Sequence, residues 1–147
     1  MTRTDGTISN SQIIDIGGLA PNHRATLSAG WVKGPLAINA RENYYSSWVD
    51  AEDYPFRDGA GNVVSGQKFG AKFTTDLDIS YTFARRFTLT LGSTNIFNTY
   101  PDKIKASPDN RIYTVTSSLS DGQVYPRSGG PFGINGGFWY AKVKIKY

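Results

Sequence analysis

Cysteine is absent from this chain of 147 residues, and histidine and methionine each occur only once. The lack of cysteine excludes disulfides, thiolate metal sites and cysteine nucleophiles. A single histidine, His23, excludes a histidine-rich metal site, and its position in "PNHR" predicts a loop before a strand. We therefore expect no enzyme activity and no cofactor.

Long apolar runs are also absent, which excludes a membrane-spanning helix. The chain has the length of one domain, and its 39% hydrophobic and 19% charged residues exclude a highly charged disordered polypeptide. Residues 1–10 lack the apolar stretch of a secretion signal, so either the protein stays inside the cell or Met1 is not the true start. The net charge of +4 is modest, and we expect no nucleic-acid partner.

The chain does contain long stretches in which apolar and polar residues alternate. Successive side chains of a strand point to opposite faces, so such alternation predicts strands with one apolar face. The clearest example is residues 71–83, and the closing residues 136–147 alternate apolar side chains with three lysines. We predict five strands and no helix, at residues 24–32, 36–49, 71–83 and 87–97 and at the C-terminus.

The predicted connections alternate in length. Two or three residues join the first strand to the second and the third to the fourth, whereas the other two connections are about twenty and forty residues long. Short turns on one side and long loops on the other are typical of an outer-membrane β-barrel. Aromatic residues near the strand ends fit the girdles of such barrels.

Three charged residues need an explanation within this pattern. Glu42 interrupts the face shared by Leu36, Ile38, Ala40, Tyr44 and Trp48, and we attribute it to a bulge or to a position near the membrane rim. Asp76 and Asp78 lie two apart on one strand face, an arrangement that can mimic an acid and base pair. We interpret both as solvated charges facing the lumen, beside Lys72.

Three segments together resemble the C-terminal end of a TonB-dependent outer-membrane receptor. They are the tetrapeptide "NIFN" at residues 95–98, the turn-rich approach at residues 131–137, and a final strand that ends on an aromatic residue. The resemblance covers nearly the whole chain, from about Leu19 to Tyr147. It implies an all-β antiparallel up-and-down meander of about five long strands, a segment of a large transmembrane β-barrel with two long extracellular loops.

The resemblance also implies roles for individual residues. Val143, Ile145 and Tyr147 correspond to the signal read by the barrel-assembly machinery, with Tyr147 at the periplasmic rim. Loops 50–70 and 98–137 are then extracellular, where Asp53, Arg57, Asp109 and Arg111 are candidate substrate contacts. The expected lipid-facing residues are Phe73, Leu77, Ile79, Tyr81, Phe83, Phe87, Leu89, Leu91 and Trp139.

Such receptors close about 22 strands around a plugged lumen, so five strands are less than a quarter of the barrel. The sequence contains no plug domain and no TonB-contacting segment, and we expect residues 1–147 to be the tail of a longer receptor or a truncated product. The expected location is the outer membrane of a Gram-negative bacterium. Expected partners are its lipid, the rest of the barrel and plug, the assembly machinery, and TonB through the missing part.

A soluble all-β module that recognises carbohydrate or a partner protein is the alternative. It would use the aromatic residues Tyr44, Tyr45 and Trp48. A basic β-platform for single-stranded nucleic acid is a weaker third interpretation.

Overall fold

The computed structural model describes residues 16–50, 56–57, 63–64, 67–103, 124–126 and 131–147. Residues 16–18 are helical, and every other regular element is a β-strand. Within the described ranges, no helix has the length and apolar character needed to cross a membrane. The chain divides into two compact units, one formed by residues 24–45, 72–100 and 135–147 and the other by residues 1–23, 46–71 and 101–134.

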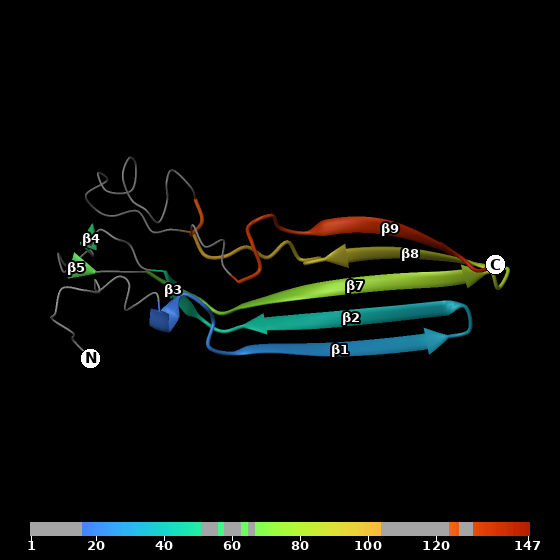
Figure 1. The fold of residues 1–147 in the computed structure, drawn as a ribbon, viewed down its shortest axis with the longest axis horizontal. Helices are drawn as coiled ribbons and strands as arrows, with labels where there is room; N and C mark the ends of the chain where they lie inside the picture. The colour runs from blue at the N-terminus through green and yellow to red at the C-terminus, as the bar shows by residue number, and fades with distance from the viewer. Residues whose placement is uncertain (1–15, 51–55, 58–62, 65–66, 104–123, 127–130) are drawn as a thin grey trace. The chain divides into compact units, whose positions relative to one another are not determined.

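The first unit is a five-stranded antiparallel meander (Figure 1). Its strands follow one another across the sheet in chain order: β1 (Arg24–Lys33), β2 (Leu36–Tyr45), β7 (Lys72–Phe83), β8 (Phe87–Thr94) and β9 (Phe138–Ile145). The prediction of five strands in an antiparallel meander is confirmed. The two short turns, at residues 34–35 and 84–86, lie at the same end of the sheet as the C-terminus.

Two of the predicted strand ends are wrong. The second strand ends at Tyr45 and not at Val49, because residues 46–47 leave the sheet and Trp48 begins the separate strand β3 (Trp48–Asp50). The fourth strand ends at Thr94, and residues 95–97 form a turn. Trp48 and Phe97 fall in the same two-residue period as Tyr44 and Leu91, although polar residues stand between them, so this period misplaces both ends.

The strand pairing places most apolar side chains on one side of the sheet and most polar side chains on the other, which defines two faces. Every pairing in the sheet runs without a skipped residue, so odd-numbered residues of β1, β7, β8 and β9 share a face with even-numbered residues of β2. We call this the apolar face; its apolar members are Ala25, Leu27, Ala29, Trp31, Leu36, Ile38, Ala40, Tyr44, Phe73, Leu77, Ile79, Tyr81, Phe83, Phe87, Leu89, Leu91, Trp139, Ala141, Val143 and Ile145.

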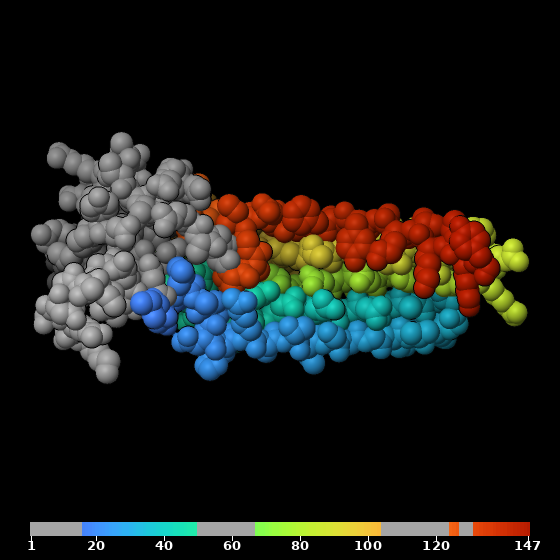
Figure 2. All heavy atoms as spheres, viewed as in Figure 1, coloured from blue at the N-terminus to red at the C-terminus, as the bar shows by residue number. Residues whose placement is uncertain are grey.

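The opposite side, the polar face, carries hydroxyls, amides and charges. Pairs of hydroxyls meet across neighbouring strands there, with oxygen–oxygen distances of 2.7 Å for Ser80 and Thr90 and 2.9 Å for Thr82 and Thr88. Lys142 and Lys144 of β9 lie on the same face, opposite Thr90 and Thr88. Figure 2 shows β1 and β9 along the two margins of the sheet.

Glu42 is a charged residue within the apolar face, and the explanation by a bulge is wrong. Glu42 is paired in register with Leu27 on one side and Thr75 on the other, so no extra residue is inserted. Its carboxylate oxygen Oε2 accepts a hydrogen bond from the Thr75 hydroxyl at 2.5 Å. Glu42 lies one row inside the pair Tyr44 and Phe73, whose ring centroids are 4.9 Å apart near the long-loop end of the sheet.

The other unit contains the buried aromatic pair of the described chain. β3 pairs with β6 (Gln67–Phe69), and β4 (Phe56–Arg57) pairs with β5 (Val63–Val64). Trp48 and Phe69 are the buried large hydrophobic side chains among the described residues, and their rings stack with centroids 5.4 Å apart. Trp48 therefore does not share a face with the residues of β2, as the sequence pattern had suggested.

The turn between β7 and β8 holds two residues in an unfavourable conformation. Ala84 and Arg85 have φ angles of 50° and 54°, and the Arg86 N–H donates to the Phe83 carbonyl at 3.3 Å. Positive φ at both central residues is the pattern of a type I′ turn, in which glycine and asparagine are favoured. Ala84 and Arg85 both carry a Cβ, which disfavours this region.

We predict that Arg85→Gly stabilises the protein by about 1 kcal/mol, because glycine adopts positive φ without the Cβ penalty. The measurement is the free energy of unfolding from urea titrations under identical solvent conditions. Arg86→Gly is the matched control, because Arg86 is not among the positive-φ residues and glycine there gains nothing. A loss of stability in Arg85→Gly equal to that in the control would contradict this account of the turn.

Candidate functional site on the polar face

Two adjacent rows of side chains on the polar face bring charged, amide and aromatic groups together. In one row, Gly30, Asn39, Asp78, Gly92 and Tyr140 lie opposite one another across all five strands. In the neighbouring row, Ser28 pairs with Arg41, Arg41 with Asp76, and Thr94 with Phe138. The rows are two residues apart along each strand, so their side chains are neighbours on one face.

Gly92 makes the contact at the centre of this site possible. The Tyr140 hydroxyl donates a hydrogen bond to Asp78 Oδ1 across β8, directly above Gly92. A Cβ atom on Gly92 would lie 2.3 Å from Asp78 Oδ1 and 2.3 Å from Tyr140 Cζ, closer than any real contact. A side chain at position 92 would therefore force Asp78 and Tyr140 apart.

Asp76 is held by two hydrogen bonds, so the interpretation of this residue as a solvated charge is wrong. Its Oδ1 accepts from the Asn95 backbone N–H at 3.0 Å, and its Oδ2 accepts from Asn43 Nδ2 at 3.3 Å. Asn43 Oδ1 in turn accepts from the Thr26 hydroxyl at 3.1 Å. The residue paired directly opposite Asp76 is Arg41, which sequence reasoning did not connect to it.

Asp78 also differs from the interpretation as a solvated charge, because it accepts the hydrogen bond from Tyr140. Asp76 and Asp78 thus have separate partners: Asn43 and Asn95 bind Asp76, and Tyr140 binds Asp78. Neither donates to nor accepts from the other in the described structure, and they do not form a shared-proton pair of the kind used for acid and base catalysis. The arrangement is that of a polar surface with fixed acceptors.

Several polar groups of the site have no partner within the described residues. Arg41 and Asn39 are exposed, and neither forms a hydrogen bond or ion pair with another described residue. The same holds for the hydroxyls of Ser28 and Thr94. The site therefore presents unused hydrogen-bond donors next to the carboxylates of Asp76 and Asp78.

The surface is hollowed at this point. A cavity of about 400 Å³ opens on the polar face, and the ten residues around it are Ser28, Ala29, Gly30, Asn39, Ala40, Arg41, Asp76, Asp78, Thr94 and Tyr140. Gly30 is one of these residues, and Asn39 Oδ1 lies 3.0 Å from the position that a Cβ of Gly30 would occupy. This volume is at the lower end of the range for small-molecule pockets.

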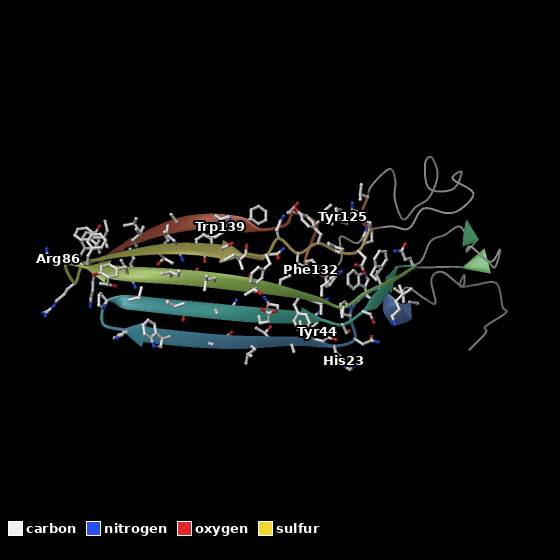
Figure 3. The ribbon with its side chains drawn as sticks, turned by 180° about the vertical axis from the view of Figure 1, so that it is seen from behind. His23, Tyr44, Arg86, Tyr125, Phe132 and Trp139 are labelled. Atoms are coloured by element: carbon white, nitrogen blue, oxygen red, sulfur yellow. The ribbon has the colours of Figure 1, made fainter. Side chains whose placement is uncertain are left out.

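Tyr140 lines the hollow on its β9 side, and Phe138 lies in the neighbouring row, opposite Thr94. Phe138 and Tyr140 project from the polar face, with exposed fractions of 55% and 40%. Trp139, between them, belongs to the apolar face (Figure 3). Of the three consecutive aromatic residues at positions 138–140, only Trp139 points to the side expected for lipid.

The tetrapeptide at residues 95–98 closes the end of the site. The buried Asn95 exchanges two hydrogen bonds of 2.8 Å with the Thr99 backbone, and its φ angle is 49°. Asn98, with φ of 56°, accepts a hydrogen bond from the Gly137 N–H at 2.9 Å, just before β9. Asparagine tolerates positive φ, and its side-chain amide can form hydrogen bonds with backbone groups that have no backbone partner in a turn. The motif thus links the exit of β8 to the start of β9.

The structure groups most of the predicted site residues. All nine predicted lipid-facing residues lie on the apolar face, as do Val143 and Ile145 of the predicted assembly signal. Tyr147 follows the last strand residue and is fully exposed. Asp53, Asp109 and Arg111 lie outside the described residues, and Arg57 is described only as part of the backbone of β4.

The aromatic residues of the alternative binding surface do not lie together. Tyr44 is on the apolar face, Tyr45 is on the polar face with the Arg24 guanidinium 5.9 Å from its ring centroid, and Trp48 is 2% exposed. His23 precedes β1 as predicted, and its backbone N–H donates to the Ser46 hydroxyl at 3.1 Å. Within the described parts of the chain, no group of three acidic, histidine or cysteine side chains is arranged to hold a metal ion.

Comparisons of the chain with protein-family models, with curated proteins and with solved structures found no match.

Proposed function

We propose that this chain is the C-terminal barrel segment of a TonB-dependent outer-membrane receptor that takes up a scarce nutrient of the siderophore-iron, saccharide or cobalamin class. In this role it supplies barrel wall, extracellular loops and the final assembly strand. It contributes no catalysis. TonB contacts the receptor only through parts that these residues do not include.

The exposed apolar face is the observation that carries the proposal. Trp139 is 74% exposed, Val143 63% and Leu91 55%, and the apolar side chains continue across all five strands. Soluble monomers rarely expose a contiguous apolar patch of more than a few hundred Å². Lipid is a solvent in which such a face is stable, provided that the opposite face remains in water or against a plug.

The dimensions of the apolar face support a bilayer as its surroundings. From Phe73 to Phe83, β7 advances about 34 Å at about 3.4 Å per residue. A strand tilt of about 40° reduces this to a height of about 26 Å, close to the apolar band of about 25 Å on outer-membrane barrels. Aromatic side chains mark both limits, with Tyr44 and Phe73 at one end and Phe83 and Phe87 at the other.

The open edges of the sheet indicate what else is needed. Within the described residues, β1 pairs only with β2 and β9 only with β8. Unpaired backbone groups each cost several kcal/mol in lipid, so both edges require further strands. Four antiparallel pairings make β1 and β9 run in the same direction, and a fully antiparallel barrel therefore needs an odd number of additional strands from the rest of the receptor.

The proposal assigns an orientation to the segment. The turns at residues 34–35 and 84–86 lie in the periplasm, together with Tyr147, and the connections 46–71 and 95–137 lie outside the cell. Val143, Ile145 and Tyr147 serve first as the signal for the barrel-assembly machinery, and Val143 and Ile145 afterwards face lipid. The polar face, with its hollow, lines the lumen in the extracellular half of the barrel.

Tryptophan fluorescence in brominated lipid tests this proposal. Trp31 and Trp139 are 50% and 74% exposed on the apolar face, whereas Trp48 is buried against Phe69 in the other unit. Three variants that each keep one tryptophan, with the other two changed to phenylalanine, are prepared in bilayers with bromine on the acyl chains. We expect strong quenching of Trp31 and Trp139, because their rings contact the acyl chains.

Trp48 provides the internal control, because its ring is covered by protein and should be quenched least. Equal fluorescence of all three variants in brominated and ordinary lipid would contradict a lipid-facing sheet. So would a protein that remains in the soluble fraction after mixing with the bilayers.

Arginine substitutions provide a second prediction. Leu77→Arg, Ile79→Arg and Leu89→Arg should each lower the free energy of unfolding from the bilayer by about 2 to 4 kcal/mol, because a charge near the midplane is costly. Thr90→Arg is the matched control on the polar face of β8, and its effect should stay below about 1 kcal/mol. Urea titration in lipid vesicles measures the difference, and equal effects on both faces would refute the assigned facing.

A further inference from the structure

The two exposed aromatic rings on the polar face are unexplained by a lipid-facing sheet. Phe138 and Tyr140 both point away from the apolar face. Tyr140 lines the hollow together with Asn39, Arg41 and Asp78, and Phe138 lies opposite Thr94, which also lines it. A surface that faces water or a charged part of the protein accounts for exposed lysines and aspartates. It does not account for exposed aromatic rings, because apolar surface is unfavourable in water. The rings lie beside fixed polar groups, so one ligand could contact both kinds of surface at once.

The charges of the hollow restrict the ligand. Asp76 and Asp78 repel an anion such as a phosphate or a carboxylate. Arg41, which no described carboxylate pairs with, repels a cation from the same space. A neutral ligand avoids both costs.

The hydrogen-bonding groups restrict the ligand further. Arg41 and Asn39 offer unused N–H donors, while Asp78 Oδ2 offers an acceptor beside them, because the Tyr140 hydroxyl is bound to Oδ1. A ligand with adjacent hydroxyl groups fits this set, because each hydroxyl both donates and accepts a hydrogen bond. The planar amide, guanidinium and carboxylate groups of the protein lie side by side and can bind such neighbouring hydroxyls. The C–H face of a pyranose ring is apolar and can stack on an aromatic ring, and Tyr140 and Phe138 supply such rings.

We propose that the hollow on the polar face binds a neutral saccharide. Asp78, Arg41 and Asn39 bind its hydroxyls, and Tyr140 and Phe138 stack on its ring. Gly30 carries no side chain that would fill the hollow, whereas the space above Gly92 is occupied by the hydrogen-bonded Asp78 and Tyr140 that the ligand would contact. This inference selects the saccharide class among the nutrients of the proposed function. It rests on the proposed function only for the claim that the bound saccharide is taken up by the receptor.

The test is saturation-transfer NMR on the protein purified from its own cells, at the length at which it occurs there. The probes are maltotriose and cellotriose, and any detergent used must carry no sugar headgroup. We expect magnetisation transfer to the ring protons of at least one trisaccharide. Inorganic phosphate in excess should not displace it, because the site disfavours anions.

Variants locate the binding to this hollow. Asp78→Asn and Tyr140→Ala should each weaken trisaccharide binding about tenfold or more, through the lost charged acceptor and the lost ring. Tyr140→Phe keeps the ring and should retain more binding than Tyr140→Ala, without a large change in packing. Thr88→Ala, on the polar face of β8 but outside the hollow, is the matched control and should bind like the unaltered protein.

Three results would overturn the inference: no transfer to either trisaccharide, transfer that is unchanged in Asp78→Asn and Tyr140→Ala, or displacement by phosphate. The outcome is separable from that of the lipid experiment. Quenching by brominated lipid without saccharide binding would leave the barrel proposal standing and remove the saccharide. Saccharide binding without quenching would leave the saccharide inference standing and remove the barrel proposal, and it would support a soluble carbohydrate-binding sheet.

Discussion

An unbroken register across five strands is the constraint on which the rest of the structure depends. Side chains of a strand alternate between faces, so a slip of one residue in any strand would move its whole apolar set to the other side. A slip in β9, for example, would place Lys142 and Lys144 among Leu89 and Leu91. The sheet can therefore have one apolar and one polar face only because every pairing runs without an inserted residue.

The same register builds the hollow on the polar face. Glycines at positions 30 and 92 stand in one row with Asn39, Asp78 and Tyr140, so that the larger side chains extend over the glycines and meet one another. Two opposite requirements are thus met by one backbone arrangement. The apolar face needs a continuous hydrocarbon surface, and the polar face needs gaps between its side chains. Alternation of residue types along each strand supplies both.

Much of the fold could be predicted from the sequence, because strands such as 72–83 show a two-residue period over their whole length. The strand ends were harder to predict: Trp48 falls in the same two-residue period as Tyr44, across Ser46, although the strand stops at Tyr45. The partners of Asp76 and Asp78 could not be predicted, since Asn43, Asn95 and Tyr140 come from three other segments that only the register brings near. Asn95 and Asn98 were recognised as part of a motif, but their side-chain bonds depend on positive φ angles that the sequence does not reveal.

The central claim is that the apolar face of this sheet lies in an outer membrane as part of a larger receptor. Fractionation of source cells, followed by immunoblotting with an antibody against residues 102–121, tests it most directly. The account predicts a band in the outer-membrane fraction several times larger than 16.1 kDa. A single band at 16.1 kDa in the soluble fraction would contradict it.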